Sequence, residues 1–247
     1  MKIVIIVQAR MGSTRLPGKV MRTLAGRPML DHVLDRLERV AGADEVVVAT
    51  TEQEHDQAIV DLVGARPSIG LFCGSEHDVL ARYHAAAQQY GADVVVRITA
   101  DCPLIAPSVV DRCIEVFRSR AGSIDYVTTG MRRTYPRGLD TEVLNFQALD
   151  AAHREATEDW DREHVTAFVY KRPERFRLLS VEDDADHSHL RWTVDTPEDF
   201  EFVSRIYDAL YSSNPRFDYH DVLALLARHP SWSDINRHVR QKSELDA

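Results

Sequence analysis

The chain has few cysteines, and none of them lies in a metal-binding or redox pattern. Among its 247 residues only Cys73, Cys102 and Cys113 are cysteines, and they form no CxxC pair and no zinc-ligand spacing. Reduced thiols are therefore the expected state, as is typical of a cytoplasmic protein. Long apolar runs are also missing: the run after Lys2 has only the length of a strand, and no segment approaches the roughly 18 apolar residues of a membrane span. We expect a cytoplasmic protein with no signal peptide and no membrane partner.

Basic residues are outnumbered by acidic ones. The chain has 30 Lys and Arg against 39 Asp and Glu, which gives a formal net charge of −9. Because nucleic-acid backbones attract basic surfaces, this balance argues against a nucleic-acid partner. The sequence also has no HExxH motif of a zinc protease and no Ser–His–Asp spacing that points to a covalent nucleophile.

What the chain does have is an alternation of apolar strands and amphipathic helices. Strands are expected at residues 3–7, 45–50, 69–73, 93–99, 125–129, 141–144, 176–181 and 190–194. Helices are expected at residues 27–40, 54–63, 78–90, 107–117, 146–156, 162–170, 197–211 and 217–229, with a short one after Pro230. Apolar strands that alternate with helices predict an α/β domain with a mainly parallel sheet, covered on both faces.

The segment from Gln8 to Lys19, here called the basic loop, follows the first expected strand. It contains three cations, Arg10, Arg15 and Lys19, and no acid, and its glycines and proline keep it out of regular structure. A strand followed by cations and free backbone N–H groups predicts a polyanion site, with plain solvated surface as the alternative. A Walker A loop is excluded, because five residues rather than four separate the two glycines and a valine follows the lysine.

Two aspartates follow apolar segments that are far apart in the sequence. Asp101 follows the expected strand 93–99, and Asp195 follows the expected strand 190–194. Because ligands bind at the carboxyl ends of parallel strands, we expect both carboxylates beside the basic loop. Mg²⁺ takes one or two carboxylates together with phosphate oxygens, so the pair predicts a magnesium site. The alternative is structural: Asp101 caps a turn, and Asp195 precedes the helix that begins at Pro197.

Three further stretches are rich in hydrogen-bonding groups. At residues 74–83 a loop enters a helix, and its N–H groups suit a base edge or a ribose, although an ordinary helix capped by Ser75 is the simpler explanation. The stretches 135–142 and 161–166 are dense in the Asp, Glu, Arg and His side chains that a polyol substrate needs, with solvated loops as the alternative. His164 would act as a general base only within hydrogen-bond reach of the reacting oxygen.

The basic loop resembles the signature loop of the cytidylyltransferases that make CMP-activated sugar acids, which include the CMP-Kdo synthetases and the acylneuraminate cytidylyltransferases. Five further stretches are similar to the branch of the spore coat polysaccharide biosynthesis protein F. They are Gly-Ser-Glu-x-Asp-Val-Leu-x-Arg-Tyr from Gly74, Arg-Ile-Thr-Ala-Asp-Cys-Pro-Leu from Arg97, Pro-Arg-Gly-Leu-Asp-Thr-Glu from Pro136, Asp-Arg-Glu-His-Val-Thr from Asp161 and Thr-Val-Asp-Thr-Pro-Glu-Asp from Thr193. Each motif is moderately specific, but five in order over nearly the whole chain are strongly so.

The resemblance implies a Rossmann-like, three-layer α/β/α nucleotidyltransferase fold with an inserted acceptor-binding lobe. We expect one domain over residues 1–247: a nucleotide-binding half at 1–122, the acceptor-binding lobe at 123–190, and a return strand with the C-terminal helices at 191–247. The implied reaction is Mg²⁺-dependent transfer of CMP from CTP to a sugar acid or related acceptor, with release of pyrophosphate, in surface polysaccharide or glycoconjugate biosynthesis. A homodimer is implied by the same analogy.

The resemblance also implies roles for individual residues. Catalytic contacts to phosphate are expected from Arg10, Arg15 and Lys19. Nucleotide contacts are expected from Gln8, Ala9, Arg10, Gly12, Ser13, Lys19, Gly74, Ser75, Arg82 and Thr99. Acceptor contacts are expected from Arg137, Asp140, Glu142, Glu163 and His164, and magnesium contacts from Asp101 and Asp195.

This chain departs from the family in two places. It has Ala-Asp-Cys-Pro where CMP-Kdo synthetases have Gly-Asp-Glu-Pro, and its motifs after Pro136 are not those of the Kdo or neuraminate enzymes. The resemblance therefore does not identify Kdo or neuraminate as the acceptor of this chain. Two alternatives stay open. One is a GT-A glycosyltransferase, although its usual Asp-x-Asp motif is absent near Asp101. The other is a non-catalytic nucleotide-binding protein, which pyrophosphate release would distinguish from an enzyme.

Overall fold

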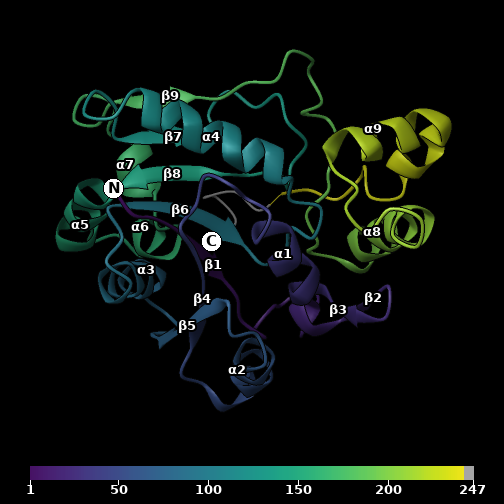
Figure 1. The fold of residues 1–247 in the computed structure, drawn as a ribbon, viewed down its shortest axis with the longest axis horizontal. Coiled ribbons are helices and arrows are strands. Elements are labelled where there is room, and N and C mark those ends of the chain that lie inside the picture. The colour runs from purple at the N-terminus through teal and green to yellow at the C-terminus, as the bar shows by residue number, and fades with distance from the viewer. Residues whose placement is uncertain (242–247) are drawn as a thin grey trace.

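A seven-stranded sheet with the order β5-β4-β1-β6-β8-β7-β9 lies at the centre of the computed structural model, which describes residues 1–241 (Figure 1). Its strands are β1 (Ile3–Gln8), β4 (Glu45–Thr51), β5 (Ile69–Gly74), β6 (Val94–Thr99), β7 (Tyr126–Thr128), β8 (Glu142–Asn145) and β9 (Leu178–Ser180). Only β8 is antiparallel to its neighbours, and the other strands of this sheet share one direction. The predicted mainly parallel sheet is therefore confirmed.

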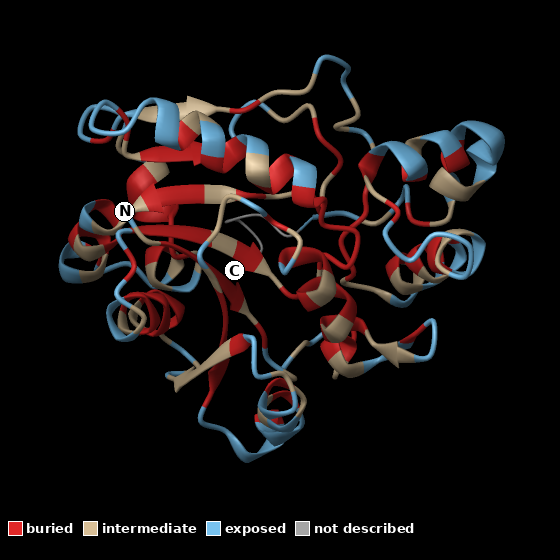
Figure 2. Ribbon diagram, viewed as in Figure 1, coloured by how far each residue is buried: buried red, intermediate tan, exposed pale blue. Residues whose placement is uncertain are grey.

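Helices cover both faces of the sheet, because the strands are apolar on both faces. Along β1, Ile3 and Ile5 pack toward one layer, and Val4 and Ile6 pack toward the other. The first layer contains α1 (Met29–Leu37), α2 (Gln57–Gly64), α4 (Pro107–Ser119), α8 (Pro197–Leu210) and α9 (Tyr219–Arg228). The second contains α3 (Val79–Gln89), α5 (Phe146–Glu155), α6 (Asp159–Glu163) and α7 (Ala167–Tyr170). Figure 2 shows the central strands almost entirely buried, so the three-layer α/β/α fold is confirmed.

The remaining elements are short. The hairpin of β2 (Thr23–Leu24) and β3 (Arg27–Pro28) precedes α1, and single 3₁₀ turns lie at η1 (Lys19–Met21), η2 (Glu54–Asp56) and η3 (Pro230–Asp234). The short helix expected after Pro230 is therefore present as η3. Helix α1 begins at Met29 rather than at residue 27, because the hairpin occupies the residues before it.

The strand order reverses at β1, which lies between β4 and β6. The last residues of β1 and β6, Gln8 and Thr99, are register partners. The segments that follow the two strands therefore begin side by side. A crevice at such a point is where open α/β sheets bind ligands.

The segment 123–190 extends the sheet. It supplies β8, β7 and β9 at the edge beyond β6, and its helices α5, α6 and α7 lie in the second layer. The division of the chain into a nucleotide-binding half, an acceptor-binding lobe and a C-terminal part stays a prediction, and residues 242–247 of that last part lie outside the described residues.

The predicted return strand at 190–194 is wrong. The segment has no place in either sheet, and its one ladder-like contact is an isolated bridge between Arg137 and Arg191. Its backbone instead bonds to loops: the Trp192 N–H donates to the Arg137 carbonyl at 2.6 Å, and the Val194 N–H donates to the Asp101 carbonyl at 2.8 Å. The apolar residues that suggested a strand are buried because they pack between these loops and the helices of the first layer.

The predicted continuous helix at 162–170 is also wrong. It is divided into α6 and α7 by a tight turn at Val165, whose φ of 54° lies in the left-handed region. A β-branched residue adopts this conformation only under constraint from its surroundings. Val165 is fully buried, and this packing holds the turn in place.

No helix among residues 1–241 is both long enough and apolar enough to cross a bilayer.

Candidate functional site

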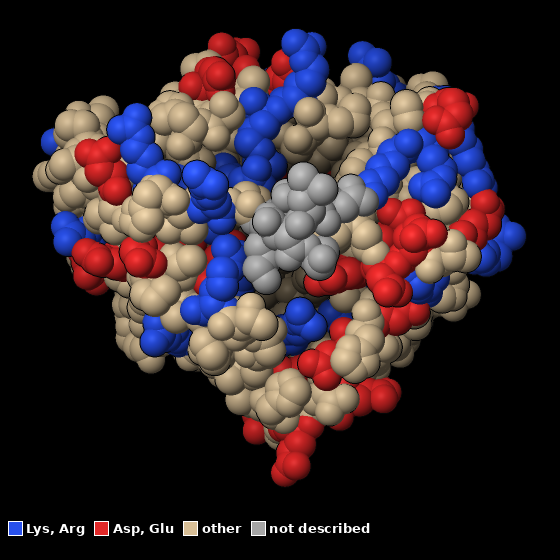
Figure 3. Space-filling model, turned by 180° about the vertical axis from the view of Figure 1, so that it is seen from behind, with Lys and Arg blue, Asp and Glu red and all other residues tan. Residues whose placement is uncertain are grey.

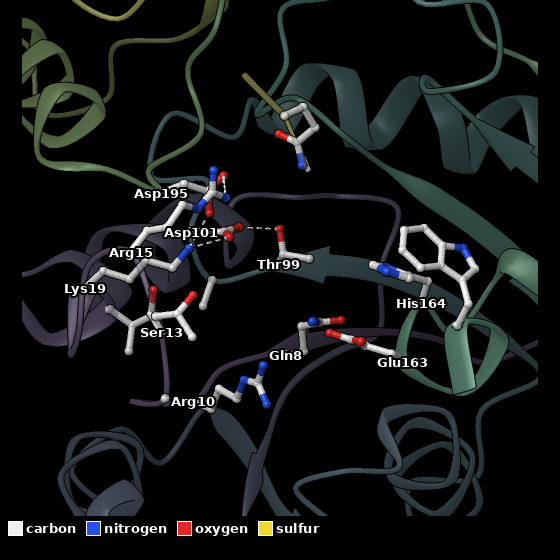
Figure 4. Close-up of a pocket in the computed structure, with 16 residues that line it drawn as sticks. Gln8, Arg10, Ser13, Arg15, Lys19, Thr99, Asp101, Glu163, His164 and Asp195 are labelled. Carbon is white, nitrogen blue, oxygen red and sulfur yellow. Dashed lines mark hydrogen bonds and ion pairs between the residues drawn. The ribbon is translucent and has the colours of Figure 1, made fainter. Parts of the chain in front are cut away.

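The basic loop lines a cavity of about 430 Å³ at the carboxyl ends of β1 and β6 (Figure 4). Its lining includes most of the residues predicted to contact a nucleotide: Gln8, Arg10, Gly12, Ser13, Lys19 and Thr99, together with Arg15. A smaller cavity of about 90 Å³ shares Gln8 and Arg10 and adds Ala9 and Arg82. We call these two cavities together the loop cavity. Figure 3 shows that Lys and Arg side chains gather near the middle of the face seen there, with Asp and Glu side chains beside them.

Gly74 and Ser75, also predicted to contact a nucleotide, do not line the loop cavity. The Ser75 hydroxyl accepts a hydrogen bond from the Asp78 N–H at 3.1 Å, and the Ser75 carbonyl accepts one from Arg82. The cap of α3 is Asp78, whose carboxylate accepts from the Ala81 N–H at 2.9 Å, so the expected cap at Ser75 is wrong. Ser75 therefore lies three residues before the N-cap, and its hydroxyl binds the backbone N–H of that N-cap, Asp78.

Lys19 forms the ionic centre of the site. Its Nζ donates at 2.8 Å to Asp101 Oδ2 and to Asp195 Oδ1 (Figure 4). It also donates at 2.8 Å to the Val194 carbonyl. The turn before it needs Gly18, whose φ of 66° is strained for any residue with a side chain. Burial alone would lower the pKa of Lys19, but the two carboxylates outweigh it and raise that pKa. The ammonium is therefore charged at neutral pH.

Asp101 and Asp195 lie together, but not at the ends of two strands. Asp101 follows β6, whereas Asp195 follows the irregular segment whose Val194 N–H bonds to the Asp101 carbonyl. The Thr193 hydroxyl donates to the same carbonyl at 3.3 Å. These two bonds bring residues 92 positions or more apart to one point. The helix that follows, α8, begins with a capping box of Thr196 and Asp199.

Three cations and three carboxylates balance one another at this point. Asp195 Oδ2 accepts from Arg15 at 2.9 Å and from Arg191 at 2.7 Å, and Arg191 also pairs with the fully buried Asp199 at 2.9 Å. Burial raises the pKa of Asp101, but Lys19 outweighs it and holds that pKa below its usual value. Both partners of the Lys19–Asp101 pair are therefore ionised in the neutral range.

The donor set fits a magnesium ion that phosphate oxygens also bind. Asp101 and Asp195 converge on one cation already, and their side chains remain 24% and 13% exposed, so the centre is open to a ligand. Among residues 1–241 no group of three or more His, Cys, Asp or Glu side chains could hold a metal by itself. An ion at this place would therefore need oxygens from a bound ligand, as is usual for Mg²⁺.

A larger cavity of about 660 Å³ adjoins the loop cavity, and we call it the second cavity. Its lining includes Arg137, Asp140, Glu142 and His164, which are four of the five residues predicted to contact an acceptor. The fifth, Glu163, lines the loop cavity instead, together with Gln8 and Arg10. His164 lines both cavities, and burial lowers its pKa, so the imidazole is neutral at pH 7. The turn at Val165 presents His164 to this junction (Figure 4).

Asp101, Asp195 and Thr99 also line both cavities. The two carboxylates therefore lie on the boundary between the loop cavity and the second cavity. A group transferred from a ligand in one cavity to a ligand in the other would pass beside them.

Arg97 is a site residue that sequence reasoning missed. Its guanidinium donates to Glu142 in the second cavity and, at 3.0 Å, to Gln8 Oε1 in the loop cavity. Burial lowers the pKa of Arg97, but the Glu142 carboxylate outweighs it and raises that pKa above the usual value. Tyr126 and Thr166 hydroxyls hold the same carboxylate at 2.6 and 2.7 Å. A charged residue inside the valine-rich strand β6 was the available signal, because such a residue is buried only with a partner.

The comparisons with known proteins agree with this architecture. Residues 4–225 match the family model described as cytidylyltransferase. The chain is 32% identical over 235 residues to the spore coat polysaccharide biosynthesis protein SpsF of Bacillus subtilis. This alignment covers 92% of this chain and 95% of that protein. It is 34% identical over 123 residues to a 3-deoxy-manno-octulosonate cytidylyltransferase of Trichlorobacter lovleyi, over 49% of this chain and 47% of that one.

Among solved structures, a cytidylyltransferase from Leptospira borgpetersenii has a TM-score of 0.90 and 32% identity, over 98% of this chain and 100% of that chain. The resemblance inferred from the sequence motifs is confirmed. Since the family model spans most of the chain and the relatives align with it, this chain belongs to the cytidylyltransferase family and is a nucleotidyltransferase.

Proposed function

We propose that this chain transfers CMP from CTP to a sugar acid or a related acceptor and releases pyrophosphate, with Mg²⁺ as its cofactor. The observation that carries the proposal is the position of Asp101 and Asp195 on the boundary between two cavities, one lined by the basic loop and the other by polar residues of segment 123–190. The first cavity suits a triphosphate and the second suits a polyol. The boundary is where the α-phosphorus would meet the acceptor.

The basic loop would bind the phosphates. Arg10 forms no ion pair among residues 1–241, so its guanidinium is available to phosphate oxygens in the loop cavity (Figure 4). Arg15 and Lys19 are paired with carboxylates in the ligand-free chain, and a triphosphate would compete for both. Their transfer to phosphate would leave Asp101 and Asp195 free to hold Mg²⁺, which neutralises phosphate charge when bound.

In the reaction, an acceptor oxygen attacks the α-phosphorus, loses its proton and forms the new phosphate ester, while the bond to pyrophosphate breaks. The protein would contribute alignment of the two ligands and preorganised positive charge. Arg10, Arg15 and Lys19 would stabilise the charge that develops on the departing pyrophosphate. Arg97 would hold Gln8 of the loop cavity and Glu142 of the second cavity in fixed positions, because it donates hydrogen bonds to both.

A screen for pyrophosphate release tests this function. Each of the four ribonucleoside triphosphates is incubated with Mg²⁺, the protein and one member of a panel of sugar acids and phosphonates. We expect release with CTP and at least one acceptor, and none when the acceptor is omitted. Release with another triphosphate in preference to CTP would contradict the cytidine assignment, and no release with any pair would favour a non-catalytic nucleotide-binding protein.

Arg137 is expected to serve the acceptor and not CTP. It lines the second cavity, burial and the neighbouring Arg133 lower its pKa, and the nearby Asp140 carboxylate is already paired with Arg133. Arg137→Gln should raise the KM for the acceptor about tenfold or more, because a charged hydrogen bond is worth about 1.5–3 kcal/mol. The KM for CTP should stay near that of the wild type. Arg132→Gln, at an exposed position in the same segment, is the matched control. An equal loss of CTP affinity in Arg137→Gln would assign this residue to the nucleotide.

A further inference from the structure

A cavity of about 220 Å³ lies between α1, α8 and the connection from α8 to α9, and we call it the arginine cavity. It shares no lining residue with the loop cavity or the second cavity. Three arginines line it: Arg36 from α1, Arg39 two residues after the end of α1, and Arg216 from the connection. The proposed reaction uses none of them.

Arg36 is a buried charge without a counter-ion. Arg36 is only 4% exposed, and its side chain forms no ion pair with any carboxylate in residues 1–241. Its Nε donates to the Tyr207 hydroxyl at 3.2 Å and its Nη1 donates to the Phe217 carbonyl at 3.0 Å. Its guanidinium also lies 4.2 Å from the centre of the Phe217 ring. These groups satisfy hydrogen bonds but bring no negative charge, so the desolvation of the cation is not fully compensated.

Arg39 adds a second unpaired cation. Its Nη1 donates to the Arg216 carbonyl at 3.0 Å, whereas its Nε is buried with no hydrogen-bond partner among the described residues. Burial and the like charges of Arg36 and Arg216 lower the pKa of Arg39, and the Asp218 carboxylate, which caps α9, offsets this only in part. Neither Arg39 nor Arg216 forms an ion pair within residues 1–241. The Arg39 guanidinium is therefore repelled by both Arg36 and Arg216.

The acidic residue in the cavity wall does not neutralise them. Asp35 is already held by Arg27 at 2.6 Å and by Arg66 at 2.7 Å. His32, also in the wall, adds no charge at neutral pH, because burial lowers its pKa. Its Nε2 donates to the Leu24 carbonyl at 2.6 Å. The wall thus presents three cations and no free carboxylate.

We propose that the arginine cavity binds a phosphate-type anion. Guanidinium groups match the oxygens of a phosphate in forked pairs, and an anion here would compensate the charge of Arg36 and accept from the unpaired Arg39 Nε. Tyr207 also lines the cavity, but its hydroxyl already donates to the Pro103 carbonyl at 2.7 Å, so the guanidinium groups are the main donors. The occupant would be inorganic phosphate, pyrophosphate or the phosphate group of a larger molecule, and these sources are separated by the test.

The test compares anion binding by two double variants. Arg39→Gln with Arg216→Gln removes two cations from the cavity wall, one from a half-buried position and one from an exposed position. Arg118→Gln with Arg120→Gln removes two exposed cations at the end of α4 and is the matched control for net charge. Inorganic phosphate, pyrophosphate and CMP are each titrated by calorimetry and by thermal unfolding. Each protein is also prepared with Lys19→Ala, which separates binding at the arginine cavity from binding at the basic loop.

With Lys19→Ala in every protein compared, which weakens binding at the basic loop, we expect phosphate or pyrophosphate to bind the otherwise unaltered protein and the control equally. The cavity variant should bind at least about tenfold more weakly, because each lost charged hydrogen bond is worth about 1.5–3 kcal/mol. Binding of CMP but of neither inorganic anion, again lost in the cavity variant, would identify a nucleotide phosphate as the source. Equal affinity in the cavity variant and the wild type would overturn the proposal. So would an equal loss in the control pair, or binding that requires Lys19.

Discussion

Replacing Lys19 by alanine is expected to lower kcat by about 10²-fold or more, since loss of one preorganised charge contact to a reacting phosphate costs about that much. The structure gives a physical reason beyond the motif, because the Lys19 ammonium is held at 2.8 Å from Asp101 and Asp195 on the boundary between the two cavities. Once the binding of CTP has transferred this ammonium to the phosphates, it needs no further reorganisation when charge develops. The measurement is steady-state pyrophosphate release with CTP and the acceptor found in the screen.

Lys2→Ala is the matched control. Lys2 forms a surface ion pair with Glu45, so its replacement removes the same charge at a position that does not line the cavities. It should leave kcat unchanged. Normal turnover by a folded Lys19→Ala protein would remove Lys19 from the catalytic site. Far-UV circular dichroism and thermal unfolding establish whether each variant is folded.

The pH dependence of stability provides an independent check on the Lys19 centre. The pKa of Asp101 is lowered in the folded chain, so its ionised form contributes stability that is present above the usual Asp pKa of about 3.9 and is lost as the pH falls through the lowered folded value. Lys19→Ala removes the main cause of that lowering. The stability difference between wild type and variant should therefore be present at neutral pH and shrink as the pH falls below 4.

Much of the fold could be predicted because local pattern and tertiary packing agree in the first half of the chain. The strands ending at Gln8, Thr51 and Thr99 are apolar on both faces, and only a parallel sheet between two helical layers buries both faces. The segment 190–194 is equally apolar, yet it is buried between loops and forms no strand in either sheet. Apolar composition reports burial and does not distinguish a sheet from a packed irregular segment.

Some residues of the candidate site could likewise be predicted from the sequence, and others could not. The basic loop could be found because its cations cluster within twelve residues and follow a strand. Arg191 could not be found by spacing, because its role depends on a buried pair with Asp199 that only the folded chain creates. The turn at Val165 was missed for a related reason: valine gives no local signal for a positive φ, and tertiary packing imposes it. Glu163 and His164 then reach the loop cavity, which a continuous helix did not predict.

Asp101→Asn and Asp195→Asn are expected to fold, to lose most activity and to lose the extra thermal stabilisation that Mg²⁺ adds to CTP. Asparagine can still accept a hydrogen bond from Lys19, but it brings no charge to a metal. Both carboxylates lie 2.8 Å from Lys19 Nζ, so their oxygens are close enough for one ion to join them after a small movement. Because both would act on one ion, the double variant should be little worse than either single variant.

The competing explanation is that the two aspartates only position Lys19. In that case the Asn variants should keep the hydrogen bonds to Lys19, most of the activity and the full effect of Mg²⁺ on CTP-dependent stability. Asp111→Asn is the matched control, since Asp111 in α4 lines neither cavity and an asparagine oxygen can keep the 2.7 Å hydrogen bond from the Gly42 N–H, although the weaker one from the Ala41 N–H at 3.2 Å is lost. Calorimetric titration of CTP with and without Mg²⁺, together with turnover, separates the two explanations. Full activity in either Asn variant would sink the shared magnesium site, whereas activity lost together with the magnesium effect, and unaltered in Asp111→Asn, would assign both carboxylates to the ion.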